Sequence, residues 1–119
     1  MDEHKLTSAE IADAERRRYG RLDVTLPVTI RYRGRLIPAT ALNLSCGGMM
    51  LDSESAFEES GRVEVILDLS SIERDVTLRG EVVRSESAHA GARVGIRFTN
   101  LFTIGHDAVS RYLRRNGSQ

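Results

Sequence analysis

The stretch Asn43-Leu44-Ser45-Cys46-Gly47-Gly48 separates two apolar, strand-like runs, Leu36–Leu42 and Met49–Leu51. A polar corner that carries glycines between two such runs is typical of a tight connection between strands. Asn and Ser side chains can bond nearby backbone or a ligand, and glycines allow a close approach to the backbone. Upstream, the run Arg16-Arg17-Arg18-Tyr19-Gly20-Arg21 is a dense basic cluster. We expect the two stretches to meet in space and to hold an anionic ligand.

Composition predicts one small domain with a mainly aliphatic core. The chain has 119 residues, and its aromatic residues are few (Phe 3, Tyr 3, Trp 0). Lys and Arg number 17 and Asp and Glu also 17, so the net charge gives no support for a nucleic-acid or membrane partner. A single cysteine excludes an internal disulfide and fits a reducing compartment. Without a membrane-length apolar run or a signal peptide, the expected location is the cytoplasm.

Hydrophobic alternation with a period of two predicts a mainly β fold. The clearest run is Val24–Arg33, where every second residue from Val24 to Tyr32 is apolar. Six strands are expected, at about residues 24–33, 35–44, 48–52, 62–69, 74–84 and 92–99, with Gly80 at a bend or bulge of the fifth. Six strands joined by short turns indicate an antiparallel barrel or sandwich, and we favour a six-stranded antiparallel β-barrel.

Both ends of the chain show helical signals. Thr7 and Glu10 have the spacing of a capping box, which predicts a short helix or frayed arm over about residues 8–17. At the other end Thr103 is a candidate cap, an apolar stripe follows, and Asn116-Gly117 ends the C-terminal α-helix. The stripe comprises Ala108, Val109, Tyr112 and Leu113. The expected organisation is an N-terminal arm at 1–14, a barrel domain with its helix at 15–115, and a tail at 116–119.

The residue types at the two stretches suit an anionic ligand. Arg17 and Arg21 bracket three residues, and their planar guanidinium groups can bond a phosphate bidentately or address a guanine edge. Asn43 and Ser45 stand two apart, so on a strand they project from one face. Each stretch alone is also compatible with a plainer role, as a solvated basic turn or an ordinary hairpin. The two together, in this order, favour a site.

At these residues the sequence resembles a known family. Arg17-x-x-x-Arg21 followed by Asn43-x-Ser45-x-x-Gly48 is similar to the two-part signature of PilZ domains, which are cytoplasmic bacterial receptors for cyclic di-GMP. The resemblance runs from Glu15 to about Leu113. It includes the six-strand pattern, the Gly95-Ile96-Arg97-Phe98 ending of the last strand and the C-terminal helix.

The resemblance implies a role for each motif residue. Arg17 and Arg21 would grip phosphates and guanine edges, and Asn43 would bond guanine. Ser45 matches the small hydroxyl of the motif, and Gly48 the glycine that keeps the barrel surface open for the ligand.

Three further residues are candidates for contact with the ligand, the first from the resemblance and the other two from their place on the last strand. A basic residue at the position of Arg16 is associated in the family with a ligand bound as an intercalated dimer. Arg97, on the polar side of the last strand, and Gly95 beside it are candidates to border the ligand.

The expected function is a non-catalytic sensor of cyclic di-GMP that passes its signal to a downstream effector protein of unknown identity. No cofactor or metal is expected, because Cys46 has no ligand partner near it in sequence and the three histidines are scattered. Three alternatives remain. A PilZ-like interaction module would not bind nucleotide. An oligonucleotide-binding barrel would need stacking aromatics, and Tyr32 is predicted to face inward. A phosphodiesterase would need metal ligands or paired acids.

Overall fold

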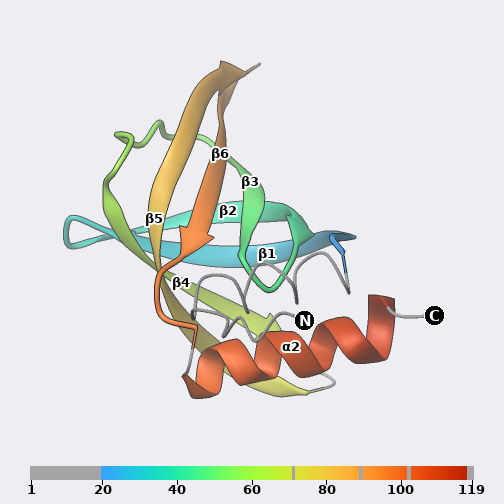
Figure 1. Cartoon of the computed structure of the whole chain (residues 1–119). Coiled ribbons are helices and arrows are strands. Elements are labelled where there is room, and N and C mark those ends of the chain that lie inside the picture. Colours follow the sequence, from blue (N-terminus) through green and yellow to red (C-terminus); the bar gives the residue numbers. More distant parts are fainter. Residues whose placement is uncertain (1–19, 71, 89, 102, 118–119) are drawn as a thin grey trace, which may run out of the picture.

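The computed structural model describes residues 20–70, 72–88, 90–101 and 103–117. Over these residues the chain forms six strands followed by one helix (Figure 1). The strands are β1 (Leu22–Tyr32), β2 (Arg35–Leu44), β3 (Gly48–Ser53), β4 (Arg62–Leu69), β5 (Glu73–Ala88) and β6 (Gly91–Phe98), and the helix is α2 (Ile104–Gly117). The helix expected over residues 8–17, together with Arg16 and Arg17, lies outside the described residues.

The strands close into an antiparallel barrel in the order β1-β2-β3-β6-β5-β4. Closure depends on β1, which pairs with β2 along its length and with β4 from Val28↔Leu67 to Arg31↔Glu64. Pro27 lies just before this second pairing begins, where its missing N–H disrupts no bond to β4. A closed barrel leaves no free sheet edge, so of the two expected architectures the barrel is confirmed and the sandwich is not.

The barrel interior is filled by the apolar residues that alternation predicted. Ile30, Val65 and Val94 are fully buried on three different strands. Tyr32 also faces inward, with its ring centroid 4.8 Å from that of Phe57. Phe57 is 5% exposed, and the neighbouring Glu58 N–H donates to the Tyr32 hydroxyl at 3.2 Å. The acidic loop after β3 is thus held to the core by its one large apolar side chain, Phe57.

Strand β5 differs most from its predicted form. It runs to Ala88, four residues beyond the predicted end at residue 84, and with β6 forms a long hairpin that projects from the barrel (Figure 1). The irregular pairing lies between Val82 and Arg84, not at Gly80, so the predicted bulge at Gly80 is wrong. Gly80 is in regular register, and a Cβ there would lie 2.6 Å from Ile96 Cγ2. The absence of a side chain at Gly80 instead allows Ile96 of β6 to pack closely against β5.

Helix α2 lies across one end of the barrel (Figure 1). Its first turn is capped as predicted, because His106 N–H donates to Thr103 Oγ1 at 3.1 Å. Ala108, Val109 and Leu113 are buried, and Tyr112 packs partly against the same core. On the exposed side of the helix, Arg111 forms ion pairs with Asp107, four residues earlier in α2, and with Glu73 of β5. Among the described residues, no helix has both the length and the apolarity needed to span a bilayer.

Candidate functional site

The corner between β2 and β3 is closed by Ser45. Its backbone N–H donates to Gly48 O at 2.9 Å, and its hydroxyl donates to the same oxygen at 3.3 Å. The hydroxyl oxygen also accepts from the N–H groups of Gly47 and Gly48, each at 3.2 Å. Ser45 is only 8% exposed. Its hydroxyl therefore holds the turn in shape, a role typical of Ser in such turns.

Asn43 presents its amide at the edge of this corner. Its Oδ1 accepts from Met50 N–H on β3 at 3.2 Å, while the residue is half-buried. An oxygen fixed on a backbone donor leaves the amide NH₂ group pointing elsewhere. Among the described residues this NH₂ group has no bonded partner. It is a donor in a fixed position, suited to an acceptor such as the O6 or N7 of a purine.

Gly48 and Gly95, the two glycines predicted at the site, differ in whether packing would allow a side chain. A Cβ at Gly48 would lie 2.0 Å from Ile96 O on β6, so any side chain would push β3 and β6 apart. A Cβ at Gly95 would meet Val83 Cγ2 at 3.5 Å and Arg84 Cβ at 3.7 Å, which is ordinary contact. Packing therefore requires glycine at 48 and not at 95. The structure thus gives Gly48 a packing role, and its expected role of keeping the surface open for a ligand stays a prediction.

Strand pairing brings Arg21 to the corner. Leu22 pairs with Leu44 and Asp23 with Asn43, so the residue before Leu22 lies level with the start of the turn. Arg21 is exposed, and Gly20 before it has φ of +71°, a conformation that favours glycine. The pairing of β1 shifts between Asp23 and Leu26, and that of β2 with β3 between Ala41 and Asn43. Such irregularities are frequent beside binding sites. Of the expected basic cluster, only Gly20 and Arg21 are described.

Arg97 and Gly95 lie next to the corner on β6. Gly48 pairs with Arg97, and Met50, the partner of Asn43, pairs with Gly95. Arg97 is exposed and forms an ion pair with Glu81 on β5. The structure therefore gathers Arg21, Asn43, Ser45, Gly48, Gly95 and Arg97 in one region of the barrel wall.

Sequence reasoning missed the attachment of the corner to α2. His106 Nε2 lies 2.7 Å from Cys46 O, and both residues are buried. Cys46 Sγ also lies 3.6 Å from Ser110 Oγ, one helical turn further along α2. The Cys46 side chain is thus buried between the turn and α2, and its backbone carbonyl ties the turn to the helix. The two partners are 60 positions apart, and no sequence signal joins them.

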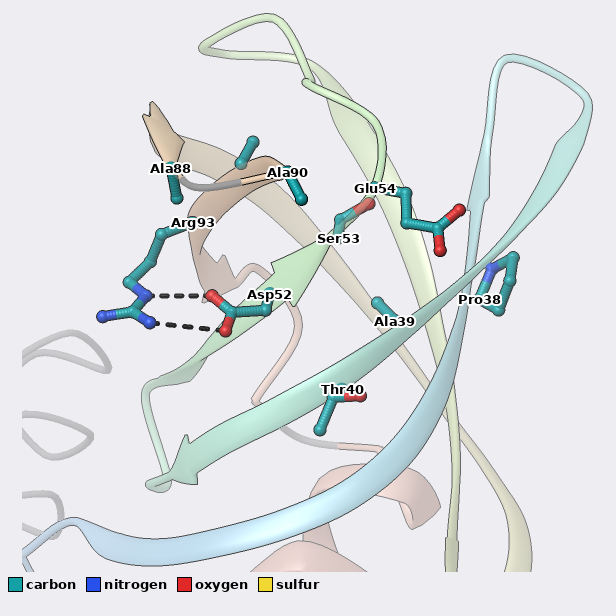
Figure 2. A pocket seen from close by; sticks show the side chains of 10 residues that line it. Pro38, Ala39, Thr40, Asp52, Ser53, Glu54, Ala88, Ala90 and Arg93 are labelled. Atoms are coloured by element: carbon teal, nitrogen blue, oxygen red, sulfur yellow. Dashed lines mark hydrogen bonds and ion pairs between the residues drawn. The ribbon is translucent and has the colours of Figure 1, made fainter.

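A separate hollow of about 520 Å³ lies on the wall away from the corner (Figure 2). Its charged lining residues are Asp52, Glu54 and Arg93. Arg93 donates to both carboxylate oxygens of Asp52, at 2.9 and 3.3 Å, which lowers the pKa of Asp52. With its arginine engaged and a second carboxylate beside it, this hollow is a poor site for an anion. In the portions of the chain that are described, no three His, Cys, Asp or Glu residues gather as metal ligands would.

Comparison with solved structures finds the same fold in several proteins. The Bacillus subtilis inhibitor of motility MotI/DgrA has a TM-score of 0.63 and 20% identity, covering 80% of this chain and 47% of its own. The PilZ domain of Escherichia coli YcgR, solved with c-di-GMP, has a TM-score of 0.62 and 18% identity, covering 86% and 88%. A tetrameric PilZ-domain protein from Xanthomonas campestris has a TM-score of 0.55 and 29% identity, covering 68% and 45%.

The chain spans less than half the length of the Bacillus and Xanthomonas proteins. A search of curated protein sequences found no significant match. The family model for the PilZ domain matches residues 15–115, which is most of the chain and includes both motifs. The resemblance read from the sequence is therefore confirmed, and the chain belongs to the PilZ domain family.

Proposed function

We propose that this protein is a non-catalytic bacterial receptor for cyclic di-GMP, acting in the cytoplasm. The observation that carries the proposal is the pairing of Leu22 with Leu44, which places Arg21 beside the Asn43–Gly48 corner. A guanidinium group opposite a fixed amide donor supplies what a phosphodiester of guanosine needs, a cation for phosphate and a donor for the base. The family match and the ligand-bound YcgR domain support the same ligand.

Each site residue then has a proposed role. Arg21, together with Arg17, binds phosphate and the guanine edge, and the Asn43 amide donates to guanine. Gly95 pairs with Met50, the partner of Asn43, and so marks the patch of wall against which a flat base would lie. Arg97 borders this patch and exchanges its partner Glu81 for a ligand phosphate.

Two finer features extend this proposal. Arg16 adds a third cation, which favours a self-stacked pair of ligand molecules with four phosphate charges. Binding orders the arm that carries the arginines, and the ordered arm signals to a partner protein. Hydrogen exchange over residues 16–21 tests the second feature, because exchange that is the same with and without saturating ligand would rule it out.

The decisive test is calorimetric titration with cyclic di-GMP of the wild type and of Arg21→Ala. We expect saturable binding that the variant weakens at least roughly 30-fold, about 2 kcal/mol. Arg35→Ala is the matched control, because this exposed arginine lies at the opposite end of β2. A stoichiometry of two ligands per chain would support the role of Arg16. Chromatography of the nucleotide after incubation should recover it intact.

The alternative is an interaction module that keeps the motif without binding nucleotide. The hydrogen bonds of Ser45 and the tight packing of Gly48 are compatible with this alternative, since the fold needs both residues whether or not a nucleotide binds. The guanidinium group of Arg21 and the amide NH₂ group of Asn43 bond to none of the described residues. The described part of the fold therefore does not need these two groups. If the folded wild type gave no heat with cyclic di-GMP, the interaction module would be the better description.

A further inference from the structure

A second hollow lies on the outer face of β1, β4 and β5, and its lining includes none of the residues of the turn Asn43–Gly48. Its volume is about 600 Å³, and we call it the basic groove. Four arginines and two glutamates line it, which leaves a net charge of two positive units. These residues are Arg31, Arg33, Arg62, Arg79, Glu64 and Glu81.

The carboxylates of the groove are already engaged by other arginines. Glu64 pairs with Arg31 at 3.0 Å, and Glu81 pairs with Arg97 from β6. Arg33 is held by Glu58 of the loop after β3, which raises the pKa of Arg33. Within the described residues, no carboxylate lies within ion-pairing distance of Arg62 or Arg79. Two guanidinium groups are therefore left with their donors facing solvent.

The register fixes how these two arginines are spaced. Arg62 lies opposite Glu81, and Arg79 lies opposite Glu64, so the two arginines are diagonal neighbours on adjacent strands. Diagonal neighbours in an antiparallel pair are about 7–8 Å apart. In an extended peptide, side chains on one face repeat every two residues, or about 6.6–6.8 Å. Two carboxylates at alternate positions of an extended segment thus match Arg62 and Arg79.

The composition of the groove favours a polypeptide over a nucleic acid. Glu64 and Glu81 interrupt the positive surface, and a continuous phosphate backbone would pass directly over them. The described lining has no aromatic side chain on which bases could stack. A peptide can place neutral residues over the glutamates and acidic ones over the arginines. We propose that the basic groove binds an extended acidic segment of a partner protein.

This proposal does not depend on nucleotide binding, because none of its residues belongs to the turn at Asn43–Gly48. The plainer account is that Arg62 and Arg79 are solvated members of cross-strand charge pairs that contribute only to sheet stability. The two accounts predict different effects on the binding of an acidic ligand when both arginines are removed.

The test uses an eight-residue fluorescein-labelled peptide of alternating Glu and Ser, with a Gln-for-Glu peptide as its control. Fluorescence anisotropy on the full chain should show saturable binding that weakens as salt is raised. The double variant Arg62→Gln/Arg79→Gln should weaken binding at least roughly tenfold. The matched double variant Arg35→Gln/Arg74→Gln removes the same charge from positions outside the groove and should bind as the wild type does.

Thermal unfolding of each variant checks that the barrel is intact. Equal loss of binding in the two double variants would overturn the proposal, because general charge would then explain the effect. It would also be overturned by no saturable binding at low salt up to millimolar protein. A single-stranded oligonucleotide of equal charge that bound more tightly, through the same two arginines, would assign the groove to nucleic acid instead.

Discussion

The corner at Asn43–Gly48 and the basic groove are built in opposite ways on one barrel. At the corner the side chains are short, and their polar atoms bond the backbone at fixed distances, as Ser45 and Asn43 do. In the groove the side chains are long, charged and exposed. Arg31 pairs with Glu64 inside the groove, and Arg33 pairs with Glu58 outside it. The corner would therefore lose little conformational entropy on binding a rigid ligand, whereas the arginines of the groove could adapt to a flexible one.

The two regions meet along one row of paired residues. Gly48 pairs with Arg97, Arg97 with Glu81, and Glu81 with Arg62, across β3, β6, β5 and β4. Arg97 belongs to the corner side and its ion pair partner Glu81 to the groove. A change of partner by Arg97 would therefore alter the charge that Arg62 faces. The rigid corner and the adaptable groove thus share one charged pair, Arg97 and Glu81.

The largest expected effect is on the rigid side, at Gly48. Gly48→Ala would place a Cβ 2.0 Å from Ile96 O, so β3 and β6 must separate. We expect the free energy of unfolding to fall by about 3 kcal/mol, measured by urea denaturation. Gly95→Ala is the control on the neighbouring strand, and it should cost less than about 1 kcal/mol because its new Cβ would have ordinary contacts. Equal stabilities of the two variants would mean that the corner is not rigid.

The sequence was sufficient for the barrel wherever apolar residues alternate. In β1 and β6 every second residue is buried or half-buried, and both strands were predicted within two residues. The end of β5 was missed because Ser85, Glu86 and Ser87 carry no apolar alternation. There the hairpin is held by backbone pairing with β6, which leaves no trace in side-chain periodicity.

At the candidate site, too, the sequence pattern predicted some features and not others. Motif spacing and resemblance identified Arg21, Asn43, Ser45 and Gly48, and strand pairing brings them together. Spacing did not indicate that Ser45 bonds its own turn or that Gly48 meets the carbonyl of Ile96, because both depend on atomic contacts. The basic groove was missed for a related reason. Its arginines are scattered over three strands, and only the register of the barrel gathers them.

A second, smaller effect on stability is expected at the contact between α2 and the corner. His106→Leu removes the 2.7 Å bond to Cys46 O and should lower the free energy of unfolding by about 2 kcal/mol. If this bond helps to position the turn, affinity for cyclic di-GMP should also fall, though by less than in Arg21→Ala. Ser110→Ala, which loses only the weak contact with the Cys46 thiol, is the control. An unchanged urea midpoint for His106→Leu would show that the corner holds its shape without the helix.

The smallest effect is expected at an exposed charged pair of the kind that fills the groove. Arg93 lowers the pKa of Asp52 through their hydrogen bonds, so the folded protein binds the Asp52 proton less readily than the unfolded chain does. The resulting stabilisation is present above the unfolded pKa, about 3.9, and is lost as pH falls through the lowered value. Arg93→Gln should therefore raise the pKa of Asp52 toward its usual value, observed by carboxyl NMR titration. Stability at pH 7 should barely change, because solvent screens exposed pairs. A large loss at pH 7 would mean that exposed ion pairs hold this wall as firmly as backbone contacts hold the corner, and the contrast between the two regions would disappear.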